Sequence, residues 1–323
     1  MRHLLRALAL IVTIVAAIDA AAQAGYPAKP VRIIVGFPPG QATDIIARIV
    51  ADKLSARLGQ SFFVDNKPGA AGIIGTEIAM KAPADGYTLQ MSSSGPLAVN
   101  PGLYAKLPYD PVRDFQPISL SATVPLFLVV HPSVNASNVK ELVALAKSQA
   151  GKLNYASGGS GVTNHLVMEM FKHAAGLDMA HVPYKGGPPA VTDLIAGQVS
   201  LMFETGPGIL PHVRSGKLRA LAVTSSKRSA TAPELPTIAE SGVPGYEATS
   251  WFALFAPART PAAIVNKLNS EVAALLKLPD VKERMLSLGA DAMPMSPREL
   301  SGYVETEIVK WGKLIKATNA KAD

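Results

Sequence analysis

The chain has 323 residues, of which 48% are hydrophobic and 17% charged, a composition typical of a globular protein and not of a disordered one. Its formal net charge of +7 comes from scattered Lys and Arg without a dense basic tract, which argues against nucleic-acid binding. It contains no cysteine, which excludes disulfides and a lipidated N-terminal cysteine.

The N-terminal segment, residues 1–24, is predicted to be a secretory signal peptide. Two arginines precede the apolar run 8–18, and Ala22-Gln23-Ala24 offers a small-residue cleavage site. A membrane anchor is the alternative, but the run is well short of the ~20 apolar residues that a span needs. Removal of the segment takes away two positive charges and one negative, leaving +6. The mature chain is therefore expected in the periplasm of a Gram-negative bacterium, with a mild attraction for small anions.

The first part of the mature chain alternates predicted strands and helices. Strands are predicted at 31–35, 62–64 and 87–91, and helices begin at Thr43-Asp44 and at Gly72. The first of these helices is expected to bury a face formed by Ile45, Ile49 and Leu54, with Ala47 and Val50 nearby. This alternation predicts a parallel α/β sheet, in which ligands sit at the carboxyl ends of the strands.

Small flexible loops follow these strands. Gly36-Phe37-Pro38-Pro39-Gly40 follows the first, and Ser92-Ser93-Ser94-Gly95 follows the third. The glycines at 69, 72 and 75 lack the spacing of a dinucleotide fingerprint, and no strand ends directly in them. They are interpreted as a site of close helix packing.

The second part of the chain repeats the architecture of the first. Two apolar runs, 115–121 and 125–130, lead out of the first domain, and a strand at 251–255 leads back. The elements expected between them are strands at 153–156, 179–182, 199–203 and 218–223 and helices at 139–147, from Thr163, and at 190–196. Helices are also expected at 262–277, 279–288 and 297–316. Two crossings predict one α/β domain (124–247) inserted in another (25–123 and 248–323), hinged around a cleft.

The segment 157–161, which contains only Ser and Gly, is the main candidate binding element. Its glycines permit positive φ and let backbone N–H groups approach a ligand, and the helix that follows offers an N-terminus that attracts anions. Ser157, Ser160 and Thr163 add hydroxyl donors for a carboxylate. The alternative is a tight turn in which Thr163 merely caps its helix.

Two catalytic alternatives are weaker. His165, Glu169 and His173 share one helix face at i, i+4 and i+8, but the H-E-x-x-H pattern and a recognised further metal ligand are missing. The serine-hydrolase elbow G-x-S-x-G fails because Val162 stands where its last glycine belongs. We therefore predict a binding protein that is not an enzyme, with no metal and no cofactor.

Four other side chains each have a structural and a functional interpretation. Lys185 is either a solvated surface residue or a counter-charge for an anion. Asp44 either caps its helix or accepts a hydrogen bond from a ligand or a bridging water, and Glu204 has the same ambiguity. Phe37 either walls the cleft or packs in the core.

Several motifs together carry a family resemblance. In chain order they are YPAKPVRIIVGFPPG from Tyr26, NKPGAAGIIGTE from Asn66, PADGYTL from Pro83, NYAS..G.G...HL from Asn154, HVPYKGGPPAVTDLIAGQV from His181, GKLRALAVTS from Gly216, PTIAESGVPGYE from Pro236 and W.ALFAPARTP from Trp251. They cover essentially the whole mature chain, which thus resembles the tripartite tricarboxylate transporter receptor family, or Bug family, of periplasmic solute-binding proteins. The resemblance implies a two-domain α/β Venus-flytrap of the type II periplasmic-binding class, with two crossover strands.

The resemblance also implies a ligand site between the two domains. The residues that it assigns are Phe37, Gln41, Thr43, Asp44, Ser92 and Ser93 in the first domain, and Ser157, Gly159, Ser160, Gly161, Thr163, His165, Tyr184, Lys185 and Glu204 in the second. The chain departs from the family pattern at three positions. Gln41 replaces a glycine, Val162 replaces a Ser or Thr, and Glu204 replaces an aspartate. These departures leave the identity of the ligand open.

The function implied by the resemblance is the capture of a small carboxylated metabolite for a membrane permease. Di- and tricarboxylates, acidic amino acids and aromatic acids are the candidate ligands, and the receptor is expected to be a monomer that delivers to an inner-membrane tripartite transporter. The alternatives that remain open are a sensor's binding subunit and a periplasmic hydrolase on the same scaffold.

Overall fold

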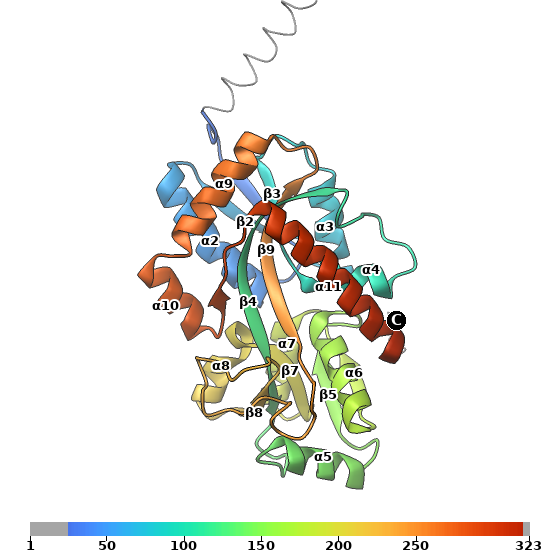
Figure 1. Ribbon diagram of the computed structural model, residues 1–323. Coiled ribbons are helices and arrows are strands. Elements are labelled where there is room, and N and C mark those ends of the chain that lie inside the picture. The colour runs from blue at the N-terminus through green and yellow to red at the C-terminus, as the bar shows by residue number, and fades with distance from the viewer. Residues whose placement is uncertain (1–24, 319–323) are drawn as a thin grey trace, which may run out of the picture.

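Two long antiparallel strands, β4 (Phe115–Val130) and β9 (Thr249–Pro257), run side by side and connect the two halves of the molecule (Figure 1). The structure is a computed structural model in which residues 25–318 are described, so the predicted signal peptide lies outside the described residues. The runs expected at 115–121 and 125–130 form one continuous strand of 16 residues. The residues that join them are compatible with a strand, so no turn separates the two runs.

Strand β4 changes its pairing partners along its length. Up to Pro125 this strand pairs with β9, and from Leu126 it pairs with β7 and β8. The strand order is β2-β1-β3-β9-β4-β7-β5-β6, with β8 and β10 also paired to β4. The remaining strands are β1 (Val31–Val35), β2 (Phe62–Asn66), β3 (Thr88–Ser93), β5 (Asn154–Ser157), β6 (Ala180–Pro183), β7 (Leu201–Thr205), β8 (Arg219–Val223) and β10 (Asp291–Ala292). We call the part built on β1–β3 the upper half and the part built on β5–β8 the lower half, as they lie in Figure 1.

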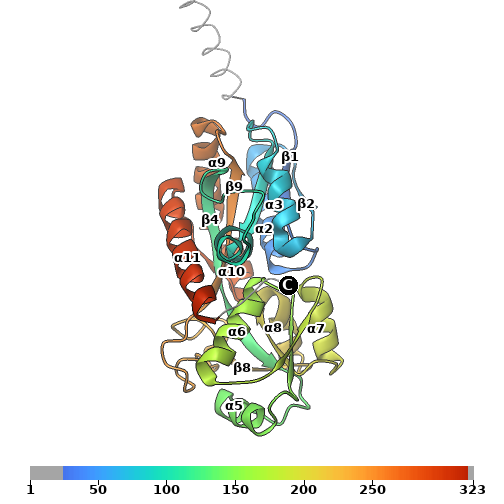
Figure 2. The same cartoon turned by 90° about the vertical axis from the view of Figure 1, so that its right-hand side faces the viewer.

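Helices cover both faces of the sheet. On the left of the upper half in Figure 1 lie α2 (Ala42–Leu58), α9 (Ala262–Leu275) and α10 (Pro279–Ser287). On the right lie α3 (Ile73–Met80), α4 (Asn100–Leu103) and α11 (Pro297–Thr318), of which α11 crosses the front. The lower half carries α5 (Val139–Ser148), α6 (Thr163–Ala175), α7 (Gly187–Ile195) and α8 (Gly206–Arg214), and Figure 2 shows these helices directly beneath the upper half. Short helical turns, η1 (Ala70–Gly72) and η2 (Gly95–Val99), lie in the upper half.

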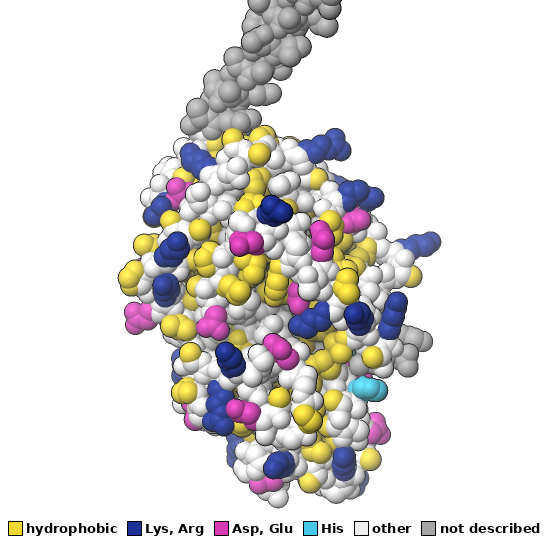
Figure 3. Space-filling view, in the orientation of Figure 1, with side chains coloured by type: hydrophobic (Ala, Val, Ile, Leu, Met, Phe, Trp, Pro, Cys, Tyr) yellow, Lys and Arg dark blue, Asp and Glu magenta, His cyan; other side chains and the backbone are white. Residues whose placement is uncertain are grey.

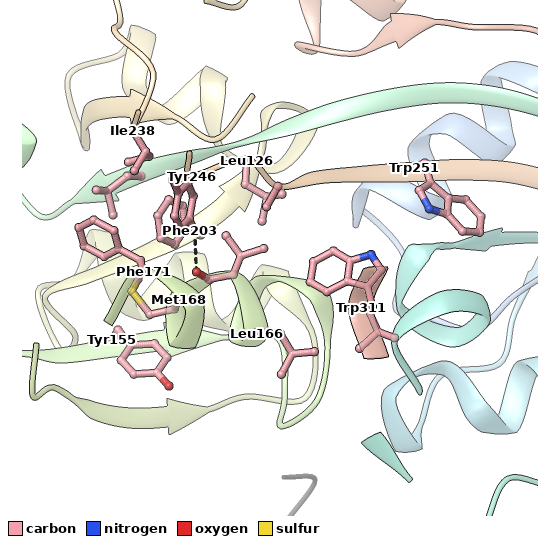
Figure 4. Close-up of a cluster of buried hydrophobic side chains, with 14 of the residues drawn as sticks. Leu126, Tyr155, Leu166, Met168, Phe171, Phe203, Ile238, Tyr246, Trp251 and Trp311 are labelled. Carbon is pink, nitrogen blue, oxygen red and sulfur yellow. Dashed lines mark hydrogen bonds between the residues drawn. The ribbon is translucent and has the colours of Figure 1, made fainter. Parts of the chain in front are cut away.

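The hydrophobic core joins the two halves mainly on one side. One cluster runs from α3 and α11 in the upper half to α5 and α6 in the lower half, whereas a second lies in the upper half apart from Val162 and a third lies in the lower half. In the shared cluster, Trp311 of α11 lies close to Leu166 of α6 (Figure 4). Glu307 accepts hydrogen bonds from the indole nitrogens of Trp251, at 3.2 Å, and of Trp311, at 3.1 Å. Away from this cluster the halves share little core, which leaves room for cavities between them.

The structure corrects three expectations about helices. The buried face of α2 is formed by Ile46, Ala47, Val50 and Leu54, while Ile45 and Ile49 are only partly buried, because it is the i, i+4, i+8 row of Ile46 that faces the sheet. Helix α8 was not expected, since its prolines resemble a turn, although proline is tolerated in a first helical turn. The segment 92–95 is not a loop: Ser92 and Ser93 end β3, and η2 follows at once.

Two surface properties bear on function. None of the helices within residues 25–318 is long and apolar enough to cross a membrane. Figure 3 shows that, on the face seen in Figure 1, the Lys and Arg side chains are scattered and form no continuous basic tract.

Candidate functional site

Three cavities lie along the boundary between the halves. The inner cavity, about 40 Å³, is lined by Phe37, Gln41, Ala42, Thr43, Ser93, Leu126, Val162, Thr163, Asn164, Glu204, Thr205, Ser250 and Phe252. The outer cavity, about 490 Å³, shares Phe37 and Val162 with the inner one and is otherwise lined by the loops 36–38, 68–72, 158–160 and 184–186 and by Tyr104. The side cavity, about 280 Å³, lies between α2, α7 and α8 and shares Gln41, Ala42 and Glu204 with the inner one.

The N-termini of two helices, one from each half, line the inner cavity. Helix α2 begins after Gln41 in the upper half, and α6 begins after Val162 in the lower half. At these two N-caps no side chain makes a capping hydrogen bond, so the first-turn N–H groups and the positive end of each dipole face the space between the halves. Hydroxyls of Thr43, Ser93 and Thr163 line the same cavity. This arrangement suits an anion that is held from both sides.

The two halves also touch directly at the inner cavity. The Ser94 hydroxyl in the upper half lies 3.1 Å from the Thr163 hydroxyl in the lower half and 3.2 Å from the Ser250 hydroxyl on β9. Beside this trio, a Cβ on Gly186 would lie 2.7 Å from Cγ of Pro38, so the two loops are in close contact. The structure therefore shows the halves drawn together.

The outer cavity is lined by a loop whose backbone is strained. Ala70 and Ala71 adopt φ of 46° and 51° between Gly69 and Gly72, whose φ values are 136° and 85°. A left-handed conformation costs an alanine roughly 1 to 2 kcal/mol, so the surrounding contacts must hold the loop in place. Neither this loop nor Tyr104 is predicted from the sequence as part of the site. An alanine does not indicate a positive φ, although the glycines on either side could have indicated an irregular loop.

The close packing predicted for the glycines of this region is observed. A Cβ on Gly75 would lie 2.6 Å from the Cα of Gly36, and one on Gly72 would lie 2.7 Å from Cγ of Pro96. These approaches place the loop that follows β1 directly beside the 69–72 loop, which brings both to the outer cavity.

The Ser/Gly turn at 157–161 uses most of its N–H groups internally. Gly158 N–H donates to Asn164 Oδ1 at 3.2 Å, Gly159 N–H to Ser157 Oγ at 3.2 Å, and Gly161 N–H to His165 Nδ1 at 3.0 Å. The expectation that these N–H groups cradle the ligand is corrected accordingly, because side chains of the turn and of α6 already accept their protons. The turn still contributes Gly159 and Ser160 to the wall of the outer cavity.

Ser157 forms a contact that resembles a nucleophile and its base. Its Oγ lies 2.7 Å from His181 Nε2 and donates to the Gly159 carbonyl at 3.0 Å. However, Ser157 is 0% exposed and lines none of the three cavities. A hydrolase mechanism through Ser157 is therefore not supported by its position.

Asp44 is bound within its own half. Its carboxylate accepts hydrogen bonds from Gly40 N–H at 2.9 Å, from Arg48 Nε at 3.0 Å and from Asn66 Nδ2 at 3.0 Å. Burial alone would raise the pKa of Asp44, but these hydrogen bonds outweigh it and lower the pKa. Gln41, not Asp44, occupies the N-cap, and Asp44 stabilises the helix start from within the first turn.

Glu204 lies at the end of β7 and is 4% exposed. Its Oε1 accepts from the N–H and the hydroxyl of Thr205 at 2.7 and 2.8 Å, and its Oε2 accepts from Asn164 Nδ2 at 3.3 Å. Burial raises the pKa of Glu204 despite these bonds. A raised pKa favours the neutral acid, which repels an anionic ligand in the adjoining cavity less than a carboxylate would.

Ten of the fifteen predicted site residues line a cavity. They are Phe37, Gln41, Thr43, Ser93, Gly159, Ser160, Thr163, Tyr184, Lys185 and Glu204. Lys185 is exposed and is the one charged side chain among the residues that line the outer cavity. Phe37 is buried in the core and walls the cavities as well, so both of its interpretations apply. Participation of these residues in binding stays a prediction.

Five predicted site residues line none of the cavities. They are Asp44, Ser92, Ser157, Gly161 and His165. Ser92 and Ser93 are neighbours on β3, and because successive side chains of a strand face opposite ways, Ser92 points away from the cavity that Ser93 lines. The other four make their hydrogen bonds to residues of their own half, so the positions of these five residues do not support a direct ligand contact.

The helix face of His165, Glu169 and His173 does not assemble a metal site. Glu169 accepts from Tyr155 and from Lys172, and His165 accepts from Gly161, while His173 is exposed. Residues 25–318 contain no group of three His, Cys, Asp or Glu placed to hold a metal ion.

Comparison with known proteins identifies a family and close relatives. Residues 46–320 match the family described as tripartite tricarboxylate transporter family receptor. The chain is 41% identical over 297 residues to protein BugT of Bordetella pertussis, covering 92% of this chain and 91% of BugT. It is 40% identical over 291 residues to the UPF0065 protein in the tcbD-tcbE intergenic region of Pseudomonas sp. strain P51, covering 90% and 86% of the two chains.

Solved structures share the fold. R. palustris Rpa4515 with adipate matches with a TM-score of 0.90 and 39% identity, over 92% of this chain and 100% of that one. MatC (Rpa3494) from Rhodopseudomonas palustris with bound malate matches with a TM-score of 0.85 and 31% identity, over 90% and 100%. The periplasmic binding protein BugD matches with a TM-score of 0.88 and 36% identity, over 92% and 100%. These matches confirm the predicted fold, a two-domain α/β periplasmic-binding protein with two crossover strands.

Proposed function

We propose a function on the basis of family membership: the chain belongs to the tripartite tricarboxylate transporter receptor family. In our proposal it captures a small carboxylated metabolite between its two halves and delivers it to an inner-membrane permease of the tripartite type. The protein would act as a monomer in the periplasm after loss of residues 1–24. Its relatives with adipate and with malate support a di- or tricarboxylate more directly than an acidic amino acid or an aromatic acid.

The observation that carries this proposal is the pair of helix N-termini at the inner cavity. Helices α2 and α6 come from opposite halves, and neither N-terminus has a side-chain cap within the described chain. One carboxylate of the ligand would accept hydrogen bonds from both first turns and from nearby hydroxyls, directly or through water. The remainder of the ligand would extend past Phe37 into the outer cavity, which is large enough for a small dicarboxylate.

Binding of this kind stabilises the closed arrangement. Only when the halves are together can the ligand contact α2 and α6 at once, so its affinity for the closed state exceeds its affinity for the open one. The hydroxyl contact between Ser94 and Thr163 further stabilises the closed state. A closed receptor then presents both halves to the permease in a defined geometry.

The test is calorimetry and thermal shift with a panel of adipate, malate, citrate, glutamate and benzoate. We expect saturable binding of at least one member. The double variant Thr43→Val with Ser93→Ala removes two hydroxyls from the inner cavity, and each lost hydrogen bond to a charged group costs about 1.5 to 3 kcal/mol. Affinity should therefore fall at least about tenfold.

Ser92→Ala is the matched control, because Ser92 adjoins Ser93 but faces away from the cavity. It should bind with unchanged affinity. Equal affinity in the double variant would remove the inner cavity from the site, and chemical conversion of a panel member would favour the hydrolase alternative.

A further inference from the structure

We propose that His165 is a positioning residue, which holds the Ser/Gly turn in its binding conformation only while its ring is neutral. The inference rests on the proposed function, since the turn forms one wall of the outer cavity. It makes ligand affinity depend on pH through a side chain that does not touch the ligand.

The direction of one hydrogen bond sets the protonation state. The backbone N–H of Gly161 donates to His165 Nδ1 at 3.0 Å. A backbone amide can only donate, so Nδ1 must carry a lone pair and the neutral ring must hold its proton on Nε2. An imidazolium has no acceptor nitrogen, so protonation breaks this bond whichever way the ring is turned.

Loss of this hydrogen bond affects the outer cavity through the position of Gly161. Its φ of 79° is a conformation that few residues other than glycine adopt, and a Cβ there would lie 2.4 Å from Cδ2 of Leu103 and 3.4 Å from the hydroxyl of Tyr104. Leu103 and Tyr104 belong to the upper half, and Tyr104 lines the outer cavity. The Gly161 amide therefore lies where the turn of the lower half presses against the wall of the upper half.

His165 lies at one end of a group of three stacked aromatic rings. The His181 ring of β6 is stacked on it at 4.1 Å and 13°, and the Tyr155 ring of β5 lies 6.4 Å away. His181 Nε2 in turn contacts Ser157 Oγ, so the two imidazoles support the turn at both of its ends. Stacking at this distance disfavours a positive charge on both rings at once.

Charged groups near the stacked rings have opposing effects on the protonation of His165. Glu169, on the same helix, faces His165 and favours its protonated form, but Lys172 and the Tyr155 hydroxyl already bind that carboxylate. The positive end of the α6 dipole favours the neutral form. Tyr104 from the upper half is the nearest titratable group on the far side of Gly161.

The test compares two substitutions of His165. Asn places an amide oxygen near the position of Nδ1 and cannot titrate, whereas Phe preserves the stacked ring and removes the acceptor. Dissociation constants for adipate and malate are measured by calorimetry from pH 8 to pH 6, where both carboxylates of each ligand stay mostly ionised. Wild-type affinity should fall about two- to threefold across this range, because a histidine with the reference pKa of about 6.5 is about three quarters protonated at pH 6 and the protonated form lacks one hydrogen bond. His165→Asn should bind at pH 8 like the wild type and lose the dependence, and His165→Phe should bind weakly at both values.

Two other histidines serve as controls. His173→Asn changes an exposed residue on the same helix, and His212→Asn changes one that lines the side cavity. Both variants should keep the wild-type pH profile. A pH profile that survives in His165→Asn would overturn the proposal, and so would a wild-type affinity that is the same at pH 8 and pH 6.

A ligand-free measurement separates this inference from the proposed function. The amide resonance of Gly161 in a nitrogen-15 spectrum should shift with pH in the wild type and stay constant in His165→Asn. If none of the panel compounds binds but this shift is observed, the proposed function fails and the positioning role stands. If the resonance does not move in the wild type, the positioning role is wrong whatever the protein binds.

Discussion

Glu204 is the one carboxyl group among the residues that line the three cavities. The family resemblance predicts a shorter aspartate at this position. The Oε2 of Glu204 reaches the first turn of α7, where a Cβ on Gly187 would lie 2.9 Å away. The Gln41 side chain approaches the same glycine from the upper half. Gln41 and Glu204, two of the three departures expected from the resemblance, therefore meet at Gly187, where the inner and side cavities adjoin.

Burial of Glu204 predicts a dependence of stability on pH. Its folded-state pKa is raised, so between the unfolded value of about 4.3 and the folded value the native protein holds a proton that the unfolded chain releases. This contribution to stability is fully present below the unfolded pKa and is lost as pH rises through the folded pKa, with a slope of at most about 1.4 kcal/mol per pH unit. Glu204→Gln removes the titration. Melting temperatures of the wild type should therefore fall relative to this variant above about pH 4.5, and parallel curves would contradict the raised pKa.

Helix α8 is the element that brings the lower half against the 288–289 loop of the upper half. Gly206, its first residue, approaches that loop so closely that a Cβ would lie 2.2 Å from the Leu288 carbonyl oxygen and 2.9 Å from the Cα of Gly289. The guanidinium of Arg214, at the other end of the helix, donates to the Ser287 carbonyl at 3.1 Å. Contacts at both ends fix how α8 lies against the upper half.

The variant Gly206→Ala tests this contact. Since the clash is with backbone atoms, α8 must shift relative to the loop, and we expect a loss of about 1 to 3 kcal/mol in the free energy of unfolding. The matched control is Gly302→Ala in α11, where a Cβ would meet nothing within 4 Å. That exposed helical position should gain about 0.5 to 1 kcal/mol. Denaturant unfolding of both variants is the measurement, and equal stability of the two would show that α8 moves freely.

On the scale of the whole molecule, the two halves are joined on the side where α6 and α11 share a hydrophobic core. The chain has two tryptophans, and both belong to this core. Trp251 lies on β9 and Trp311 on α11, and the second of these is near Leu166 of the lower half (Figure 4). The two indoles are therefore natural probes of motion between the halves.

We predict that a saturating carboxylate changes the intrinsic fluorescence mainly through Trp311. The expected reason is that a turn of the lower half about this joined side changes the contacts that α6 makes with Trp311, whereas Trp251 packs within the upper half. Trp251→Phe should keep most of the ligand-induced change, and Trp311→Phe should lose it. The opposite pattern would place the motion within the upper half and not between the halves.

The sequence by itself determined most of the order of strands and helices and the two crossings between the halves, but not the helices α4 and α8 or the short strand β10. Hydrophobic period, turn residues and helix starts are local properties, so residues such as Val31 to Val35 or the glycines after β1 reveal them without knowledge of the fold. The carboxyl ends of parallel strands lie at one edge of a sheet, so the sequence also indicated which loops would face the boundary. The division at residues 124 and 248 stays a prediction.

Only the tertiary structure decided which groups of those loops reach a cavity. Ser92 and Ser93 are chemically alike and adjacent, yet packing turns just one of them inward. The N–H of Gly161 looked available to a ligand until α6 brought His165 against it, and Ala70 and Ala71 showed no sign of a left-handed loop. In each case the outcome depends on a partner distant along the chain or on backbone geometry that the partner enforces, and a local pattern does not encode either one.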